Sequence, residues 1–405
     1  MSAQDEGHLR SVSQGRVARP LRLLMVGGGP GAFIGGIHRM AAALDGRWQL
    51  VGGAFSADAA KSKVFAATLG LAGDRASGSW PELLAGELAR SPADRGDAVA
   101  IVTPNALHAE VAIAAMNAGI AVICDKPMTA TLADAERIAD VSRSTGVPAF
   151  VTYNYTGYPM VRAARHLIAT GAIGTLRRIF VEYHQGWMAT PLEGTGQKQA
   201  SWRTDPAQSG GGCIGDIGSH AENLCTFVTN SNFVEVSARL FSIVPGRQVD
   251  DDAAIQGELE CGARVSITVS QICIGEQNNL RIRVHGDLGS LWWAQEQPNE
   301  LKLADGHGTR ILHRGENLAG QDHGQALGIR LPAGHPEGFI EAFATLYSDI
   351  ASALTKTAAP AQLAMLHNAD AGLRGVRFID ACQRSSKLTQ PVRLGGTAKR
   401  SSEGA

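Results

Sequence analysis

The sequence predicts an α/β protein with two domains: a doubly wound parallel sheet, followed by an α+β domain with a large, mostly antiparallel open sheet. Strand and helix patterns alternate about six times between residues 21 and 152, as in doubly wound folds. Beyond residue 153 the strands lengthen and are joined by turn-like pairs such as Cys261-Gly262, which favours antiparallel pairing. A chain of 405 residues, 44% of them hydrophobic, is long enough to bury two cores.

The first domain is expected over residues 21–152, where short apolar runs end in turn residues. The run Leu21–Gly27 breaks into glycine and predicts a buried first strand. Further strands are predicted at 48–55, 98–103, 120–124 and 148–152, and helices at 37–44, 59–69, 108–118 and 132–145.

The second domain is expected over residues 153–390, where apolar and polar residues alternate. One ring of Trp292-Trp293 is expected in the core, because neighbouring strand residues face opposite sides. Residues 1–20 are predicted to form a flexible arm and residues 391–405 a frayed tail. The predicted strands are 176–184, 233–243, 253–260, 263–271, 281–285 and 290–294, and the predicted helices are 337–354 and 369–385, which are free to pack back on the first domain.

Composition argues against several classes of protein. With a net charge of −1, the chain lacks the basic footprint of a nucleic-acid-binding protein. No apolar run reaches the roughly 18–20 residues of a membrane helix. The first twenty residues lack the apolar region of a secretory signal. The six cysteines stand singly, which predicts reduced thiols and a cytoplasmic protein.

A glycine-rich loop, Gly27-Gly28-Gly29-Pro30-Gly31-Ala32-Phe33-Ile34-Gly35, joins the first strand to a helix. Glycines let the backbone turn tightly beside a pyrophosphate, whose charge the helix N-terminus favours. Gly27 and Gly29 suit the first two positions of a dinucleotide fingerprint. The third is Ala32 or Gly35, and we favour Gly35, which makes the loop about three residues longer than usual. The predicted contacts to the cofactor are Gly27, Gly29, Phe33, Ile34 and Gly35.

The end of the second strand lacks an acid where one normally binds the ribose of NAD. Ser56 with Lys61 suits a 2′-phosphate, whereas Asp58 suits ribose hydroxyls. Ser56 or Asp58 also suits the N-cap of the next helix, and that role is compatible with either cofactor. The choice between NAD and NADP stays open on these residues.

Three further segments carry a family resemblance: Thr103–His108, Asp125-Lys126-Pro127 and the glycine-rich run Gly210–His220. Together with Trp202-Arg203 they resemble the Gfo/Idh/MocA oxidoreductases over about residues 21–390. The resemblance implies a Rossmann domain, and a second domain whose open sheet joins subunits into a homodimer or homotetramer. It also implies a carbohydrate substrate and NAD as cofactor, with NADP not excluded.

The resemblance assigns Lys126, Asp216 and His220 to catalysis on a secondary hydroxyl. Removing the hydroxyl proton requires a base, for which His220 suits because an imidazole titrates near neutral pH. Lys126 supplies a cation for the developing alkoxide, and Asp216 holds a neighbouring hydroxyl or tunes His220. At position 125 this chain has aspartate where the family usually has glutamate. Expected cofactor contacts also include Thr103, Asn105, His108, Asp125 and Lys126.

Other residues are expected around the substrate. Asn154 and Tyr155 lie at the crossover between domains, although a hydrogen-bonded turn suits them as well. Lys198 or Arg203 suits an anionic substituent and Trp202 a sugar ring, although Trp202 also suits a packing anchor in a surface loop. With Asp216 and His220, the expected substrate contacts are Asn154, Tyr155, Lys198, Trp202 and Arg203.

Three functions follow from these residues. The first is a dehydrogenase of a sugar, glycoside or inositol-like polyol. The second is an NAD-dependent redox glycosidase, and the third is an inactive NAD-binding regulator. A metal site at Cys213, Asp216, His220 and Cys225 is not expected, because no second ligand cluster with zinc-like spacing accompanies them. We also predict a cis peptide bond at Lys126-Pro127, where the chain must turn sharply at a strand end.

Overall fold

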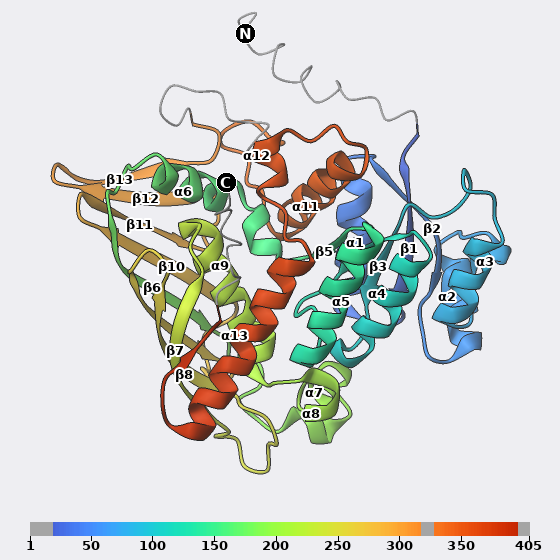
Figure 1. Ribbon diagram of the computed structural model, residues 1–405, viewed down its shortest axis with the longest axis horizontal. Coiled ribbons are helices and arrows are strands. Elements are labelled where there is room, and N and C mark those ends of the chain that lie inside the picture. The colour runs from blue at the N-terminus through green and yellow to red at the C-terminus, as the bar shows by residue number, and fades with distance from the viewer. Residues whose placement is uncertain (1–18, 317–327, 396–405) are drawn as a thin grey trace, which may run out of the picture.

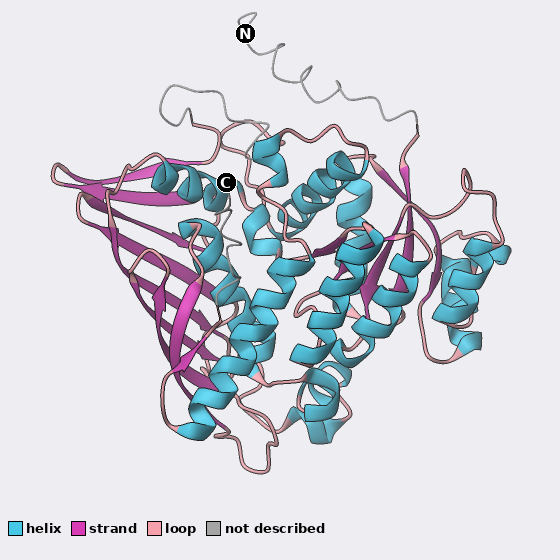
Figure 2. Cartoon of the chain, in the orientation of Figure 1, coloured by secondary structure: helices cyan, strands magenta, loops and turns pink. Residues whose placement is uncertain are grey.

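The computed structural model describes residues 19–316 and 328–395 and contains two sheets with helices packed between and around them (Figures 1 and 2). Most of the predicted arm, and the tail beyond residue 395, lie outside the described residues. Two flanking predictions need correction. Arg19, assigned to the arm, forms an ion pair with Asp97 at 2.7 Å. Val392–Arg393, assigned to the tail, is strand β14.

The parallel sheet has five strands in the order β2-β1-β3-β4-β5. Because β2 and β3 lie on opposite sides of β1, the strand order reverses there, and ligands of such sheets bind at that reversal. The strands are β1 (Leu21–Gly27), β2 (Trp48–Ala54), β3 (Ala98–Val102), β4 (Ala121–Cys124) and β5 (Ala149–Val151).

Helices flank this sheet as the sequence predicts, with one addition and one earlier start. Helix α3 (Trp80–Leu88) was not expected; Ser79 caps it and it buries Leu83 and Leu84. Helix α1 (Phe33–Leu44) begins four residues before the expected start at residue 37. The remaining helices of this domain are α2 (Ala59–Thr68), α4 (His108–Asn117) and α5 (Leu132–Thr145), with short 3₁₀ turns η2 (Gly73–Arg75) and η3 (Asn105–Leu107).

The second sheet has nine strands in the order β13-β12-β11-β10-β6-β9-β8-β7-β14, antiparallel except between β6 and β9. Strands β12 and β13 were not predicted. Strand β13 shows no apolar alternation and is exposed except at the partly buried Leu312. Strand β12 does alternate, with Leu301 and Leu303 buried, and its pattern was overlooked. The strands are β6 (Leu176–His184), β7 (Phe233–Phe241), β8 (Asp252–Leu259), β9 (Arg264–Ser270), β10 (Asn279–Gly286), β11 (Gly289–Ala294), β12 (Glu300–Asp305) and β13 (Gly308–His313).

One face of the large sheet is covered by helices, visible as the layer between the two sheets in Figure 2. Trp293 is buried in this core and Trp292 only partly, as the alternation predicts. On the other face Glu182 pairs with Arg281 and Arg283. The predicted subunit interface through this open face stays a prediction. The helical segments of this domain are η4 (Asn154–Gly157), α6 (Pro159–Ala169), η5 (Leu192–Thr195), α7 (Lys198–Arg203), α8 (Pro206–Ser209), η6 (Ile214–Gly218), α9 (Ser219–Thr229), α11 (Phe339–Leu354), α12 (Pro360–Leu363) and α13 (Ala369–Leu388).

Helices α11 and α13 return to the parallel sheet (Figure 1). Phe343 and Tyr347 of α11 share a core with β1, and Trp48 Nε1 donates to the Tyr347 carbonyl at 2.8 Å. Leu373 and Val376 of α13 share the core on the other side of the sheet. No described helix is long and apolar enough to cross a bilayer.

A buried ion pair fixes α11 to α6. Arg162 Nη2 lies 2.5 Å from Asp349 Oδ2, with the two side chains 1% and 5% exposed. We predict that Asp349→Ala destabilises the protein by about 3–5 kcal/mol, because it leaves a buried guanidinium without its carboxylate. Urea unfolding followed by circular dichroism measures this. Asp380→Ala, which removes the exposed partner of Arg384, is the control and should cost less than about 1 kcal/mol. Equal losses in the two variants would contradict the assignment.

Candidate active site

The glycine-rich loop brings backbone atoms closer together than any side chain would allow. Gly27 has φ +87°, and a Cβ added there would lie 2.7 Å from the Val102 carbonyl oxygen. A Cβ on Gly29 would lie 2.3 Å from the Phe55 carbonyl oxygen, and one on Gly35 would lie 2.4 Å from the Gly28 Cα. Gly35 therefore makes the close helix–strand contact that the third fingerprint glycine provides.

The start of α1 offers free donors at this loop. No side chain caps Ala32, and the first turn holds no acidic residue, so the amides of Phe33 and Ile34 are open to an anion. Thr103 Oγ1, beside Gly27, is buried without a hydrogen-bond partner. These features fit the phosphates and hydroxyls of a dinucleotide.

At the end of β2, the candidate ribose contacts interact with one another. They are Ser56, Asp58 and Lys61. Asp58 caps α2 by accepting from the Lys61 amide at 3.0 Å, and the Asp58 amide donates to Ser56 Oγ at 3.1 Å. The Lys61 ammonium lies 3.8 Å from Asp58 Oδ2. The capping interpretation therefore holds for Asp58.

Two side chains of the Thr103–His108 segment bond to backbone carbonyls. Asn105 Nδ2 donates to the Ser209 carbonyl at 2.9 Å and joins the two domains. His108 is fully buried, with Nε2 2.9 Å from the Thr103 carbonyl and Nδ1 3.2 Å from the Pro127 carbonyl. Both side chains thus help to position these loops, and the cofactor contact expected of them stays a prediction.

Asp125 follows β4 and accepts from Thr152 Oγ1 at 3.1 Å. His38 Nε2 of α1, which the sequence reasoning did not single out, lies 3.9 Å from its carboxylate. Burial would raise the pKa of Asp125, but His38 and Lys126 outweigh burial and hold that pKa below its usual value. The carboxylate is therefore ionised.

Lys126 crosses from the first domain to the second. Its ammonium donates to Asp216 Oδ1 at 2.9 Å and to the Asp216 carbonyl at 2.7 Å. The Lys126-Pro127 peptide bond is cis, which confirms the prediction.

Asp216 lies in η6, a π-helical segment that runs directly into α9. Such widened turns are frequent at functional sites. Its second carboxylate oxygen accepts from Arg203 Nε at 3.2 Å and Gln271 Nε2 at 2.9 Å. Burial opposes ionisation, but Lys126 and Arg203 hold the pKa of Asp216 below its usual value. Asp216 is thus a fixed anion with donors on both oxygens.

His220 lies at the start of α9, 6% exposed, and forms no hydrogen bond within the described chain. Its ring centroid is 4.7 Å from that of Tyr155 in an edge contact. Burial lowers the pKa of His220 well below 6.5, and the Lys126 charge lowers it further, against the opposing effect of Asp216. The imidazole is therefore neutral and free to accept a proton near pH 7.

A polar network lies behind His220. Tyr155 Oη is 2.6 Å from Tyr183 Oη, and Asn278 bonds both phenols, at 3.0 and 2.6 Å. Burial raises the pKa of Tyr155, so its phenol stays protonated. Asn154 Nδ2, next in the chain, is buried without a partner, which suits the substrate contact expected of it.

Lys198 and Trp202 lie on α7. Trp202 packs on the Arg203 guanidinium, with 4.3 Å between the guanidinium carbon and the ring centroid. Lys198 Nζ bonds to the Pro30 carbonyl at 3.3 Å, in the glycine-rich loop. This contact differs from the expected one, in which Lys198 faces the substrate.

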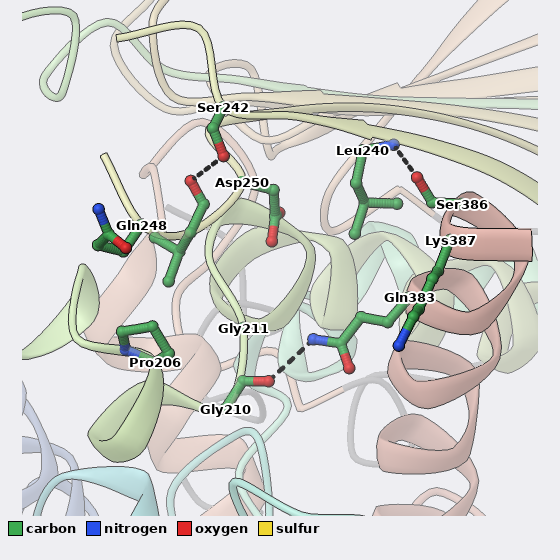
Figure 3. A pocket seen from close by; sticks show the side chains of 11 residues that line it. Pro206, Gly210, Gly211, Leu240, Ser242, Gln248, Asp250, Gln383, Ser386 and Lys387 are labelled. Atoms are coloured by element: carbon green, nitrogen blue, oxygen red, sulfur yellow. Dashed lines mark hydrogen bonds between the residues drawn. The ribbon is translucent and has the colours of Figure 1, made fainter. Parts of the chain in front are cut away.

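The run Gly210–Gly212 packs where side chains would clash. A Cβ on Gly210 would lie 2.1 Å from the Ala130 carbonyl oxygen of the first domain. A cavity of about 350 Å³ opens behind this run (Figure 3), where Asp250 accepts from the amides of Gly212 and Ile214 at 3.0 and 2.7 Å. None of the predicted catalytic residues lines this cavity. Through its two bonds, Asp250 holds the start of the π-helical segment η6 in place.

Sequence reasoning missed Gln271, Tyr183 and Asn278. Each lies in or next to a strand of the large sheet, and its approach to the site depends on strand pairing. A polar residue at a strand end is the only local signal. Within the described residues, no group of three or more His, Cys, Asp or Glu is placed to hold a metal ion.

We predict that His220 titrates below pH 6.5 and that Lys126→Met raises its pKa, because that variant removes a positive charge that opposes protonation. Long-range ¹H–¹⁵N NMR measures the titration, with His220→Gln identifying the signal among the 12 histidines. Lys387→Met, an exposed lysine on α13, is the control and should leave the titration unchanged. A pKa at or above 6.5, or one that Lys126→Met leaves unmoved, would contradict this electrostatic account.

Comparison with known proteins agrees with this geometry. Residues 21–153 match the oxidoreductase family with an NAD-binding Rossmann fold, and residues 161–292 match the GFO/IDH/MocA C-terminal domain. An uncharacterized oxidoreductase of Bacillus subtilis, YfiI, is 32% identical over 91% of this chain and 95% of its own length.

Solved structures extend the likeness to the whole fold. An inositol dehydrogenase homolog from Azotobacter vinelandii, complexed with NAD⁺, is 33% identical with a TM-score of 0.87, covering 94% of this chain and 98% of its own. An oxidoreductase from Sinorhizobium meliloti is 39% identical with a TM-score of 0.82, covering 92% and 99%. The chain belongs to the Gfo/Idh/MocA family of NAD-binding oxidoreductases.

Proposed function

We propose that this oxidoreductase is an NAD-dependent dehydrogenase that oxidises a secondary hydroxyl of a sugar, glycoside or inositol-like polyol. The observation that carries the proposal is the meeting of Lys126, Asp216 and the unbonded, neutral His220 where the two domains join. A similar structure from Azotobacter vinelandii was solved with NADH and myo-inositol, which supports this substrate class.

NAD, when bound, accepts the hydride that leaves the carbinol carbon. His220 takes the hydroxyl proton onto a ring nitrogen, because burial keeps that ring neutral and no side chain of the described residues is hydrogen-bonded to it. Lys126 donates a hydrogen bond to the same oxygen and stabilises the charge that develops as the proton leaves. After proton transfer, Asp216 stabilises the imidazolium, since its carboxylate favours the charged form of His220.

The surroundings suit a neutral, polyhydroxylated ring. Asp216 accepts hydrogen bonds, whereas Arg203 and Gln271 donate them, so adjacent hydroxyls find both kinds of partner. The orphaned Asn154 amide adds a donor and the Tyr155 ring an apolar surface. Lys126 and Arg203 are both paired with Asp216, so neither offers an unpaired cation to an anionic substrate. This complete constellation disfavours an inactive regulator.

For the cofactor, we predict that NADH binds at least about tenfold more tightly than NADPH, because Asp58 would repel a 2′-phosphate. The Lys61 ammonium is already paired with Asp58, with 3.8 Å between Lys61 Nζ and Asp58 Oδ2. Fluorescence titration of both reduced cofactors measures the ratio. Asp58→Asn keeps a good helix cap but removes the charge, so it should narrow the preference. Tighter binding of NADPH, lost in Lys61→Ala, would reverse the assignment.

For catalysis, we predict that His220→Ala and Lys126→Ala each lower kcat by about 100-fold or more while NADH binding stays intact. Their effects should be non-additive, because proton removal and alkoxide stabilisation belong to one event. Asp216→Ala should raise KM more than it lowers kcat if its main task is to bind substrate.

Steady-state kinetics on an identified polyol, paired with NADH titration, measures these effects. His307→Ala, an exposed histidine in the β12–β13 turn, is the control and should behave as wild type. If His220→Ala keeps more than about a tenth of the wild-type kcat, His220 is not the general base.

A further inference from the structure

We propose that Lys198, a residue of the second domain, binds the pyrophosphate of the dinucleotide. The inference rests on the proposed function only in requiring that the chain binds NAD. It gives the fold a cofactor contact that lies outside the glycine fingerprint and 168 residues from the loop it touches.

Lys198 lies against the glycine-rich loop of the first domain. Its Nζ donates to the Pro30 carbonyl at 3.3 Å, so the ammonium lies against the loop whose helix start receives the phosphates. A neutral carbonyl is its recorded partner, and no carboxylate within residues 19–316 and 328–395 forms an ion pair with it. Lys198 is also exposed, so its charge stays available to an incoming anion.

The helix end that follows this loop carries an uncompensated partial positive charge. The N-terminus of α1 has no capping side chain and no acid in its first turn. The partial positive charge of that helix end therefore lacks a compensating group until an anion arrives. A pyrophosphate seated there would meet backbone amides on one side and the Lys198 ammonium on the other.

The length of the glycine-rich loop lets it reach α7. With Gly35 as the third fingerprint glycine, the loop is about three residues longer than usual. The Ala32 amide donates to the Gly29 carbonyl at 3.0 Å, and Gly31 at φ +73° completes the turn. This turn leaves Pro30 exposed and within reach of α7. The extension thus places the phosphate loop beside a side chain of the other domain.

Helix α7 contacts the glycine-rich loop at one end and Asp216 at the other. Lys198 begins this helix at the phosphate loop, and Arg203 ends it at Asp216, 3.2 Å away. One short helix therefore touches both the cofactor loop and the substrate site. The glycine run after α8 packs on Ala130 of the first domain, so α7 lies close to the domain junction.

The test is the affinity for NADH and for ADP-ribose, which carries the pyrophosphate but no nicotinamide. Lys198→Gln should raise both dissociation constants about three- to tenfold at low salt, and Lys198→Arg should restore most of the affinity. The salt dependence of NADH binding should become shallower in Lys198→Gln, because one screened charge pair is gone. Lys387→Gln, an exposed lysine on α13, should change none of these values.

Unchanged dissociation constants in Lys198→Gln would overturn the inference while leaving the proposed dehydrogenase intact. An increase in the KM for a polyol with unchanged NADH affinity would also overturn it, by assigning Lys198 to the substrate. If the wild-type protein bound no NADH at all, the proposed function itself would fail. Circular dichroism of each variant confirms that folding is preserved.

Discussion

The ion pair between Lys126 and Asp216 is the contact on which this site depends, because its two partners come from different domains. Lys126 lies two residues after strand β4 of the parallel sheet, and Asp216 lies in the π-helical segment η6, which leads into the helix that carries His220. Burying either charge alone would be costly, so the pair is stable only when the domains meet correctly. Arg203 and Gln271 complete the set of donors to the carboxylate. The arrangement of the two domains and the ionisation of the site therefore depend on the same ion pair.

The same pair sets the protonation of His220. Burial and the Lys126 charge disfavour the imidazolium, whereas Asp216 favours it once a proton arrives. A base that is neutral at rest and stabilised when protonated suits reversible transfer of a hydroxyl proton. The surrounding phenols cannot replace it, because burial raises the pKa of Tyr155 and of Tyr183. The proposed proton transfer at this junction therefore rests on His220.

Much of this site could be predicted from short motifs. The glycines mark close backbone approach, and Lys126 and Asp216, expected at one site, are in contact. What failed needed three-dimensional knowledge: Gln271 reaches Asp216 only through strand pairing. His108 stands in a motif and lies against the Thr103 carbonyl, and sequence alone cannot separate a ligand contact from a buried support. Strand β13 was missed because its pairing with β12, more than a local apolar pattern, defines it. Helix α3 was missed because burial of Leu83 and Leu84 in the tertiary structure defines it.

Product stoichiometry shows whether the Lys126–Asp216–His220 junction carries out net oxidation of a hydroxyl. Wild-type protein would be incubated with NAD and a panel of cyclic polyols, sugars and aryl glycosides, with NADH followed by absorbance and products by mass spectrometry. The account predicts one NADH for each molecule converted, with a product two hydrogens lighter than the substrate. Release of an aglycone without net NADH would contradict it and identify a redox glycosidase in its place.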